Sequence, residues 1–436
     1  MNKVRLLIQF FPVWLTVFVD FLGLALVVPI FAPLILDGSL GILPEGASVA
    51  MRGWIIGTLT AIYPIGQFFG APILGKLSDR HGRKPWLVIT IGVTAIGYAI
   101  SGIGIAIGAL TPLYAGRFLA GIAGGNTSIC QSAIADITHD KQQAAFLGYL
   151  GLAMGLGFTV GPIAGGRLAD PALVSWFSWA TPFWFAALLT AFNLVLVLLL
   201  MRETLHHKHR VKISFMKGLE NIGRAFKLAS LRQILIVFFF FVLGWFFFAL
   251  FFQVYLVQKF NYTPAQIGNV FTYIAVCYAI SQGALVGPIS KRIPPRTILL
   301  FSLPILAGLF SLLLIFEVDW PLFFLYPPLA FFICLTWPNV LVILSNLAGK
   351  QQKGALFGVT QSIQSLAQAL TPLISGPLIA ISENLPTLIG AACMVIGWLT
   401  FLDIRRQRGV STAAKGEHSL PHRGSSGPWP SPPTPE

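Results

Sequence analysis

The sequence predicts an all-α integral membrane protein, with twelve transmembrane helices arranged as two pseudo-symmetric bundles of six. Hydrophobic residues make up 56% of the 436 residues and charged residues only 10%, whereas a soluble protein usually carries about 25% charged residues. Several apolar runs exceed the roughly 20 residues that a helix needs to span a bilayer. Residues 6–36 contain one charge, Asp20, and residues 233–258 contain none. The third observation is an internal repeat, which relates the two halves.

Hydropathy divides the chain into twelve candidate spans. They are residues 8–35, 53–75, 86–108, 110–135, 144–168, 180–201, 232–258, 265–288, 297–316, 321–346, 354–380 and 386–404. The first run is longer than the apolar core of a signal peptide, about 7–15 residues. We therefore expect it to be a retained helix, and an even number of spans places both termini on one side.

Lysine and arginine residues predict the orientation. With the N-terminus inside, 25 of the 29 basic residues lie on inner segments, and the outer loops hold only Arg52 and Lys259. Cytoplasmic loops of membrane proteins carry the excess of Lys and Arg. We therefore expect a multi-pass protein of the plasma membrane, the inner membrane in a bacterium, with both termini in the cytoplasm.

A long inner loop separates the two halves. Residues 1–201 form the N-terminal six-helix bundle, residues 202–231 a cytoplasmic linker, and residues 232–404 the C-terminal six-helix bundle. Apolar residues between Phe215 and Leu228 alternate with basic ones, which predicts an amphipathic helix along the inner membrane surface. The polar, Pro-rich segment 405–436 is expected to be a disordered cytoplasmic tail.

The two halves repeat a pattern of glycine and proline. Gly148, Pro162 and Gly166 in the fifth span recur 210 residues later in the eleventh span. Three matches at one offset indicate a duplicated six-helix unit. Transporters built from repeats bind their substrate near the midplane, between the repeats.

The loop after the second span carries the most specific motif. It reads Gly75-Lys-Leu-Ser-Asp-Arg-His-Gly-Arg-Lys84, and it resembles the loop 2–3 signature of the major facilitator superfamily. In that family the loop latches the halves together in the outward-facing state. The resemblance implies a gating latch made of Gly75, Asp79, Arg80, Gly82, Arg83 and Asp136. Since arginine forms forked pairs with carboxylates, we expect Arg83 beside Asp136. We also expect Asp79 to face the start of the eleventh span near Gly354.

Glycines and a proline in the fifth span resemble the Gly-Pro-rich signature of the antiporter branches of this superfamily. Small residues let membrane helices approach closely, so helix packing alone is the alternative explanation. The antiporter-motif helix is defined by Gly157, Gly161, Pro162, Gly165 and Gly166.

Ionisable residues within membrane spans are costly and are functional candidates by default. Asp20 lies near the middle of the first span, followed by Gly23, and Arg117 lies in the fourth span, followed by Gly121. Both patterns resemble the tetracycline-efflux-like drug:proton antiporters. The resemblance implies proton coupling at Asp20, with Arg117 tuning its affinity for the proton. The alternative is a purely structural ion pair between the two.

Spans seven to twelve contain no charged residue near mid-depth. We therefore expect an asymmetric central cavity, with its charge from Asp20 and Arg117 and an aromatic and amide wall from the C-terminal half. The candidate substrate-cavity residues are Tyr63, Gln67, Asn126, Gln131, Gln253, Tyr273, Trp337, Asn339, Gln361 and Gln364.

Other functional classes lack support in the sequence. There is no P-loop, zinc-type His-Glu-x-x-His motif or Ser-His-Asp set. The four cysteines lie apart in apolar segments, so we expect no metal, no cofactor and no enzymatic activity. The net charge of +14 is spread over short loops, which argues against nucleic-acid binding.

The sequence thus predicts a monomeric, proton-coupled secondary transporter in the lipid bilayer, exporting a small amphipathic molecule or drug by antiport. A siderophore or metabolite carrier, working as exporter or proton-coupled importer, is one alternative. A receptor or scaffold on a transporter fold is another.

Overall fold

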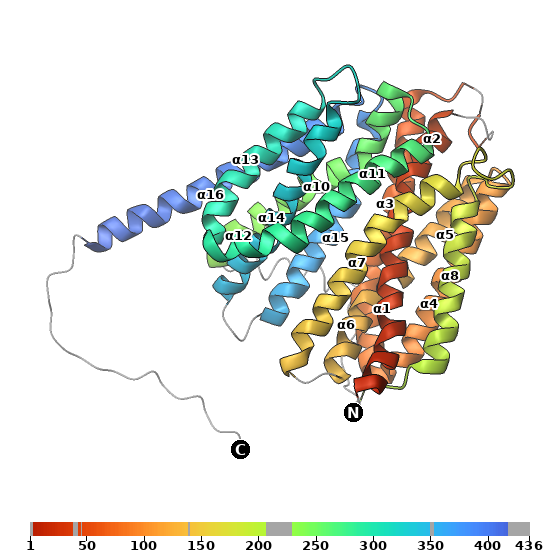
Figure 1. Ribbon diagram of the computed structural model, residues 1–436, viewed down its shortest axis with the longest axis horizontal. Coiled ribbons are helices and arrows are strands. Elements are labelled where there is room, and N and C mark those ends of the chain that lie inside the picture. The colour runs from red at the N-terminus through yellow and green to blue at the C-terminus, as the bar shows by residue number, and fades with distance from the viewer. Residues whose placement is uncertain are drawn as a thin grey trace.

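The computed structural model describes residues 3–37, 42–44, 46–137, 140–205, 229–348 and 353–416, and every regular element within them is a helix. Figure 1 shows two bundles side by side, one for each half of the chain. The N-terminal bundle consists of α1 (Lys3–Ala25), α2 (Val28–Asp37), α3 (Val49–His81), α4 (Arg83–Ala106), α5 (Leu110–Ala123), α6 (Asn126–Ile137), α7 (Asp140–Leu168) and α8 (Thr181–Leu200). The C-terminal bundle consists of α10 (Ala229–Phe260), α11 (Pro264–Ile280), the π-helix η1 (Ser281–Val286), α12 (Gly287–Arg292), α13 (Pro295–Leu313), α14 (Leu322–Ala348), α15 (Lys353–Leu378) and α16 (Leu385–Gly416).

Each predicted span corresponds to one helix or to consecutive helices that share a span. The first span is broken at Leu26–Val27, the fourth at Gly124–Gly125, and the eighth passes through η1. Within the described residues, nine helices are long and apolar enough to cross a membrane. The second, fourth and eleventh spans do not meet that criterion, because glycine, serine, threonine and glutamine dilute their apolar residues and because the fourth is broken.

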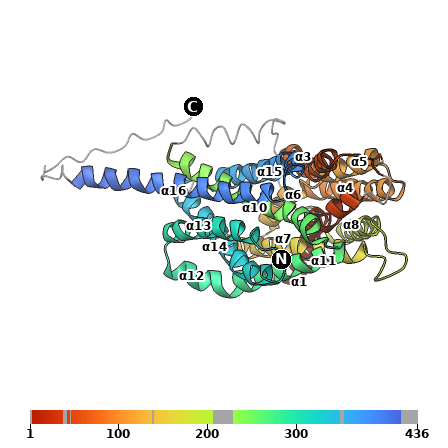
Figure 2. The ribbon, with the colours of Figure 1, turned by 90° about the horizontal axis from the view of Figure 1, so that it is seen from above.

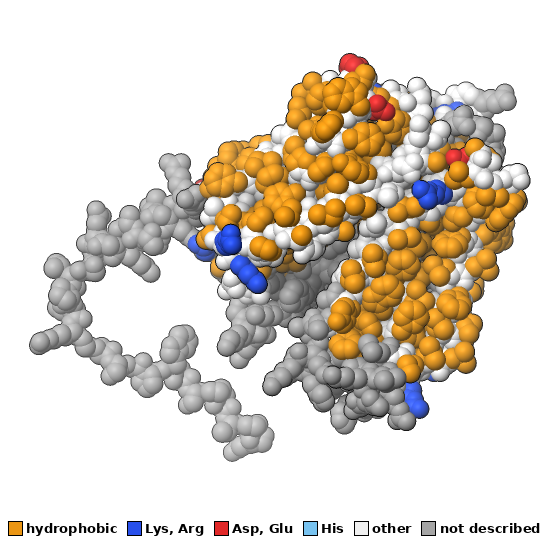
Figure 3. Space-filling model, viewed as in Figure 1, with side chains coloured by type: hydrophobic (Ala, Val, Ile, Leu, Met, Phe, Trp, Pro, Cys, Tyr) orange, Lys and Arg blue, Asp and Glu red, His pale blue; other side chains and the backbone are white. Residues whose placement is uncertain are grey.

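The sides of the bundles are apolar. Leu188 and Leu199 of α8 and Phe324 of α14 are more than 70% exposed. Figure 3 shows hydrophobic side chains over the visible side of both bundles, with acidic side chains toward the upper ends and Lys and Arg side chains toward both ends. Such a surface suits the hydrocarbon interior of a bilayer and not water.

The ends of α3 define two faces of the molecule. We call the face with the turn between α3 and α4 the Gly82 face, and the face where α3 begins the Val49 face. Close approaches of glycines between the two bundles, within the described residues, all lie near the Val49 face. Nearer the Gly82 face, a Cβ atom on Gly151 or Gly155 of α7, or on Gly283 or Gly287 of the eighth span, would meet nothing within 4 Å. The bundles are therefore in contact at the Val49 face and part toward the Gly82 face.

Two equivalent helix crossings hold the bundles together. In the first, α3 crosses α15, and a Cβ on Gly57 would lie 2.9 Å from the Gly376 Cα and still closer to the Pro372 carbonyl oxygen. In the second, α11 crosses α7, and a Cβ on Gly268 would lie 2.9 Å from the Pro162 carbonyl oxygen. Pro162 and Pro372 are a pair from the sequence repeat. Equivalent helices of the two repeats thus form two equivalent contacts between the bundles.

The C-terminus differs from the expectation. We expected the last span to end at residue 404 and a disordered tail to follow; α16 continues to Gly416, and the rest of the expected tail, residues 417–436, lies outside the described residues. Figure 2 shows α16 extending beyond the other helices. The added segment contains Ala, Arg and Gln, which favour helix, and the next proline is Pro421. The linker segment 206–228, with its expected amphipathic helix, lies outside the described residues.

Candidate functional site

The turn between α3 and α4 is held by a carboxylate that comes 120 residues later in the chain. Glu203, which follows α8, accepts hydrogen bonds from the backbone nitrogens of Arg83 at 2.8 Å and Lys84 at 3.2 Å. A negative charge is favoured at a helix N-terminus, where these N–H groups have no partner within the helix. Gly82 has φ 122° and a Cβ on it would lie 3.0 Å from Glu203 Cδ. Glycine is therefore required there by backbone conformation and by space.

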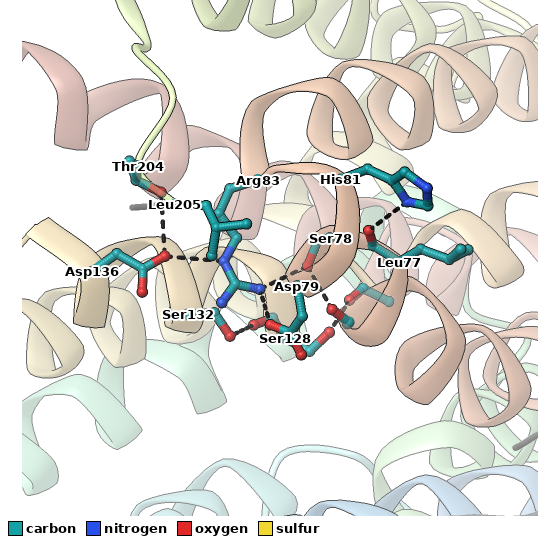
Figure 4. A network of polar contacts seen from close by, with 12 residues as sticks. Leu77, Ser78, Asp79, His81, Arg83, Ser128, Ser132, Asp136, Thr204 and Leu205 are labelled. Atoms are coloured by element: carbon teal, nitrogen blue, oxygen red, sulfur yellow. Dashed lines mark hydrogen bonds and ion pairs between the residues drawn. The ribbon is translucent and has the colours of Figure 1, made fainter. Parts of the chain in front are cut away.

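Arg83 is the centre of the latch. Its Nε donates to Asp136 Oδ2 at 3.0 Å, and its Nη1 donates to Ser78 Oγ at 2.8 Å and forms an ion pair with Asp79 (Figure 4). The Arg83 side chain is only 7% exposed, so these contacts lie largely out of solvent. The expected contact between Arg83 and Asp136 is confirmed, and the role of the latch in gating stays a prediction.

The remaining latch residues surround this contact. Gly75 faces Ser128 of α6, where a Cβ would make an ordinary contact at 3.5 Å with Ser128 Oγ, and Arg80 is exposed. Thr204 donates to Asp136 at 3.5 Å, beside Glu203. The expected approach of Asp79 to Gly354 involves a side-chain environment outside the described residues. Sequence reasoning missed Glu203, although its position just after the sixth span placed it on the same face as the latch.

The antiporter-motif helix α7 packs along the helix that carries Asp20. A Cβ on Gly157 would lie 2.5 Å from the Phe18 carbonyl oxygen, and one on Gly161 would lie 2.8 Å from that of Leu22. Gly165 similarly lies against Leu26, in the break between α1 and α2, and against Pro29, at the start of α2. Pro162 and Gly166 face α11 in the crossing described above. The motif therefore packs α7 against α1 and α2 within its own bundle and against α11 of the C-terminal bundle.

Asp20 and Arg117 are both enclosed in the N-terminal bundle, with exposed fractions of 3% and 0%. Arg117 Nη1 donates to the Gly23 carbonyl oxygen at 3.2 Å, and its guanidinium carbon lies 4.7 Å from the centre of the Tyr63 ring. No Arg117 nitrogen lies within the 4.0 Å of the Asp20 carboxylate that would make an ion pair. Asn126, at the start of α6, lies beside Asp20. The direct ion pair, our structural alternative, is thus not formed in this conformation.

Many polar atoms in this cluster have no hydrogen-bond partner. They are Asp20 Oδ2, the hydroxyls of Tyr63 and Tyr98, Arg117 Nε and Nη2, and both amide atoms of Asn126. Buried polar groups are normally paired, because leaving them unpaired is costly. A concentration of such atoms around a membrane-embedded acid makes this cluster the candidate functional site.

The position of the cluster differs from the expected cavity wall. We expected Asp20 and Arg117 to line the central cavity, yet both are sealed between α1, α3, α4, α5 and α6 in this conformation. The reason is that Tyr63, Tyr98 and Asn126 are themselves fully buried and close the cluster on several sides.

The other candidate cavity residues lie on several helices of both bundles, and their sharing of one cavity stays a prediction. Gln67 donates to the Gly124 carbonyl oxygen at 2.9 Å, at the break between α5 and α6. In the C-terminal bundle, Gln253 and Asn339 are buried and donate to Leu250 and Ser290, and Trp337 packs on Phe238 and Phe241. Tyr273 lies against Phe323 and Tyr326. Gln131 and Gln361 are exposed, and Gln364 is half-buried. Only Tyr63 and Asn126 of the ten belong to the Asp20 cluster.

Metal chemistry finds no site in the part of the chain that the structure describes. No group of three or more His, Cys, Asp or Glu side chains there is arranged to hold a metal ion. The four cysteines are free thiols, three of them buried.

Two six-span bundles with apolar sides, matched crossings and buried ionisable groups define a multi-pass membrane transporter. The family model described as Major Facilitator Superfamily matches residues 13–372 and again residues 234–430, and the chain belongs to this family. The resemblance seen in the loop motif is thereby confirmed, and the protein is a transporter rather than an enzyme.

Relatives and solved structures agree with this assignment. The chain is 30% identical to the class G tetracycline resistance protein of Vibrio anguillarum, over 82% of this chain and 87% of that protein. It is 28% identical to the class C tetracycline resistance protein of Escherichia coli (87% and 93%) and 26% identical to multidrug resistance protein 2 of Bacillus subtilis (87% and 91%). Its fold is similar to that of a D-xylose–proton symporter, with a TM-score of 0.71 at 15% identity, over 91% of this chain and 97% of that one. The human organic anion transporter MFSD10 gives 0.67 at 20% identity, over 92% and 100%.

Proposed function

We propose that the protein is a proton-coupled exporter that moves a small amphipathic organic molecule or drug by antiport. The tetracycline and multidrug resistance proteins that it resembles over more than four fifths of its length support this substrate class. Aromatic side chains are plentiful in α10 and α14, as in the ring contacts of Trp337 with Phe238 and Phe241, and they suit an apolar substrate.

The single observation that carries the coupling mechanism is the Asp20 carboxyl. It is 3% exposed, lies near the middle of the first membrane span, and has an oxygen without a partner. A carboxyl at such a place can exist charged or neutral, and the two forms make different demands on their neighbours. Proton binding can therefore bias the protein between two conformations, provided that these differ in their affinity for the proton. Arg117, in the same cluster, supplies a fixed positive charge that favours the charged form.

We further propose that the Gly82 face is cytoplasmic and that the protein works as a monomer in the bacterial inner membrane. The bias of Lys and Arg supports the orientation, since the sequence assigns 25 of the 29 basic residues to inner segments, among them the loop that holds the turn between α3 and α4. The conformation, closed at the Val49 face, is then inward-facing. The latch residues would come into contact with the C-terminal bundle only after the Gly82 face closes.

Proteoliposomes holding purified protein test the proposal. Tetracycline and ethidium are the probe substrates, and their movement is followed under an imposed pH gradient, with and without an uncoupler. We expect Asp20→Asn to exchange substrate across the membrane but to lose movement driven by the gradient. Asp170→Asn, which changes an acid in the loop between α7 and α8, should keep both. An Asp20→Asn protein that transports with unchanged pH dependence would remove Asp20 from the coupling mechanism.

A further inference from the structure

Two tyrosines that belong to no sequence motif lie in the cluster that holds Asp20 and Arg117. Tyr63 comes from α3 and Tyr98 from α4, and both are 0% exposed. Their hydroxyl groups face each other, and both tyrosines lie within electrostatic reach of Asp20 and Arg117. The two hydroxyls are close enough to interact with each other, but neither has a partner in good hydrogen-bond geometry. A buried tyrosine usually finds such a partner, so this pair is unusual.

Tyr98 meets α1 one turn away from Asp20. Its ring and hydroxyl fill the space at Gly23, where a Cβ would overlap the hydroxyl and lie 3.0 Å from Cε1. The Gly23 carbonyl is also the acceptor for Arg117 Nη1, at 3.2 Å. Residues three apart lie on the same side of a helix. Tyr98 and Arg117 therefore meet α1 on the side that carries Asp20.

Tyr63 connects the same charges through the broken fourth span. The Arg117 guanidinium stands over its ring, and its hydroxyl lies against Gly124, where a Cβ would be 2.6 Å away. Asn126, which lies beside Asp20, begins α6 just after this break. Tyr63 thus reaches from the guanidinium to the break that precedes Asn126.

The chemistry of the donors explains why hydroxyl groups stand at this place. A guanidinium only donates hydrogen bonds, so it can serve a charged carboxylate but offers no acceptor to a protonated one. A phenol hydroxyl both donates and accepts. It can therefore donate to the charged carboxylate and accept from the protonated carboxyl. A site that must hold both forms needs a group of this kind, because a buried polar group without a partner is costly.

We propose that Tyr63 and Tyr98 are positioning residues for proton coupling, which keep Arg117 apart from Asp20 and serve the carboxyl in both of its protonation states. This inference rests on the proposed function. The other groups that face Asp20 are Asn126 and Cys130 of α6 and Arg117 of α5. The two further helices packed on α1 present groups that do not titrate, the glycines of α7 and Asn193 of α8, which donates to Thr16.

Removal of single hydroxyl groups tests the inference. Tyr98→Phe and Tyr63→Phe keep the rings and their packing. Tyr114→Phe is the matched control, because its hydroxyl, in the same bundle, contacts Thr58 and not the cluster. In proteoliposomes we measure tetracycline movement driven by a pH gradient and, separately, tetracycline exchange without a gradient. Tyr98→Phe and Tyr63→Phe each leave one protonation state of the Asp20 carboxyl without a hydrogen-bond partner. Each should therefore lower gradient-driven transport by about tenfold. Exchange should change by less than about twofold, and the control should change neither.

The same variants in an Asp20→Asn background separate positioning from packing. An asparagine has no second protonation state, so Tyr98→Phe and Tyr63→Phe should have no further effect on transport there. If either variant lowers exchange and gradient-driven transport equally, or still acts in the Asp20→Asn background, the positioning role is overturned. If Asp20→Asn alone keeps gradient-driven transport, the proposed function loses its proton carrier. If Asp20→Asn loses it while both tyrosine variants keep it, only the present inference fails.

Discussion

The crossing of α3 and α15 gives a sharp test of how the bundles close at the Val49 face. Gly57 packs there on Pro372 and Gly376, and a Cβ would lie 2.9 Å from the Gly376 Cα, whereas an ordinary contact begins near 3.4 Å. The obstructing atoms are backbone and cannot rotate away. The two helices must therefore separate by about 0.5 Å or more for alanine, and by more for leucine. Opening of the Val49 face relieves the clash, because the crossing then comes apart.

The magnitude follows from the cost of overpacking. Side-chain atoms forced into a close-packed interface cost about 1–3 kcal/mol. Gly57→Leu should raise the energy of the state closed at the Val49 face by about 2 kcal/mol, which shifts the equilibrium between the two states roughly 30-fold toward the open one. Gly268→Leu, at the equivalent crossing of α11 and α7, should produce a shift of similar size. Gly151→Leu is the control, because nothing lies within 4 Å of its Cβ position.

Distances between spin labels measure this shift. Leu173→Cys and Val318→Cys place labels at exposed positions on loops at the Val49 face, one in each bundle, with the four native cysteines replaced by alanine. Gly57→Leu and Gly268→Leu should move the distance distribution to longer values, and Gly151→Leu should leave it unchanged. Equal distributions for Gly57→Leu and Gly151→Leu would refute the reasoning, since the close approach would then carry no energetic weight in gating.

Two further predictions concern the ends of the helices. Glu203→Ala removes the acceptors at the start of α4 and should lower stability by about 1 kcal/mol, seen as a fall in Tm, whereas Glu317→Ala, at a carboxylate that is 88% exposed, should not. At the Val49 face, the Tyr262 hydroxyl donates to Asp319 at 2.6 Å, and burial together with Asp319 raises the pKa of Tyr262. Because the pKa of Tyr262 is higher in the folded state than in the unfolded state, its contact with Asp319 contributes fully to folding stability below the unfolded pKa of about 10. That contribution is lost as pH rises through the folded-state pKa. The Tm difference between wild type and Tyr262→Phe should thus stay constant to about pH 10 and shrink above it, and a difference that falls already between pH 7 and 9 would contradict this sign.

Periodic and local features of this protein could be predicted from its sequence. The spans follow from hydropathy, and the repeat identified Pro162 and Pro372, which the structure places in equivalent crossings. The contact between Arg83 and Asp136 followed from a motif, because a buried arginine needs carboxylates near it. These inferences depend on apolar runs, prolines and paired charges, whose structural requirements can be recognised in the sequence alone.

Features that depend on tertiary approach could not be found in this way. Glu203 caps a helix that begins 120 residues earlier, and no local pattern links the two. Tyr98 is one aromatic residue among many in apolar spans, and only its approach to Gly23 distinguishes it. The burial of Asp20 depends on how four neighbouring helices pack around α1. A central position in a span indicates depth in the membrane, but it does not say whether the side chain meets a cavity or a closed interior.

The Asp20 cluster is mechanically connected to both crossings. Through α3 the path is direct, because Tyr63 and Gly57 are six residues apart on one helix, about 9 Å by helical rise. Through α7 it runs from Leu22 of α1 to Gly161, next to Pro162, which meets Gly268 of the other bundle. Since packed interfaces tend to have discrete arrangements rather than to deform continuously, a change in how Asp20 holds α1 against α3 and α7 acts on both crossings at once. The C-terminal bundle has no charged residue near mid-depth of its spans and so no counterpart to this cluster. Under the proposed function, one titratable site in one bundle would therefore act on both crossings between the bundles.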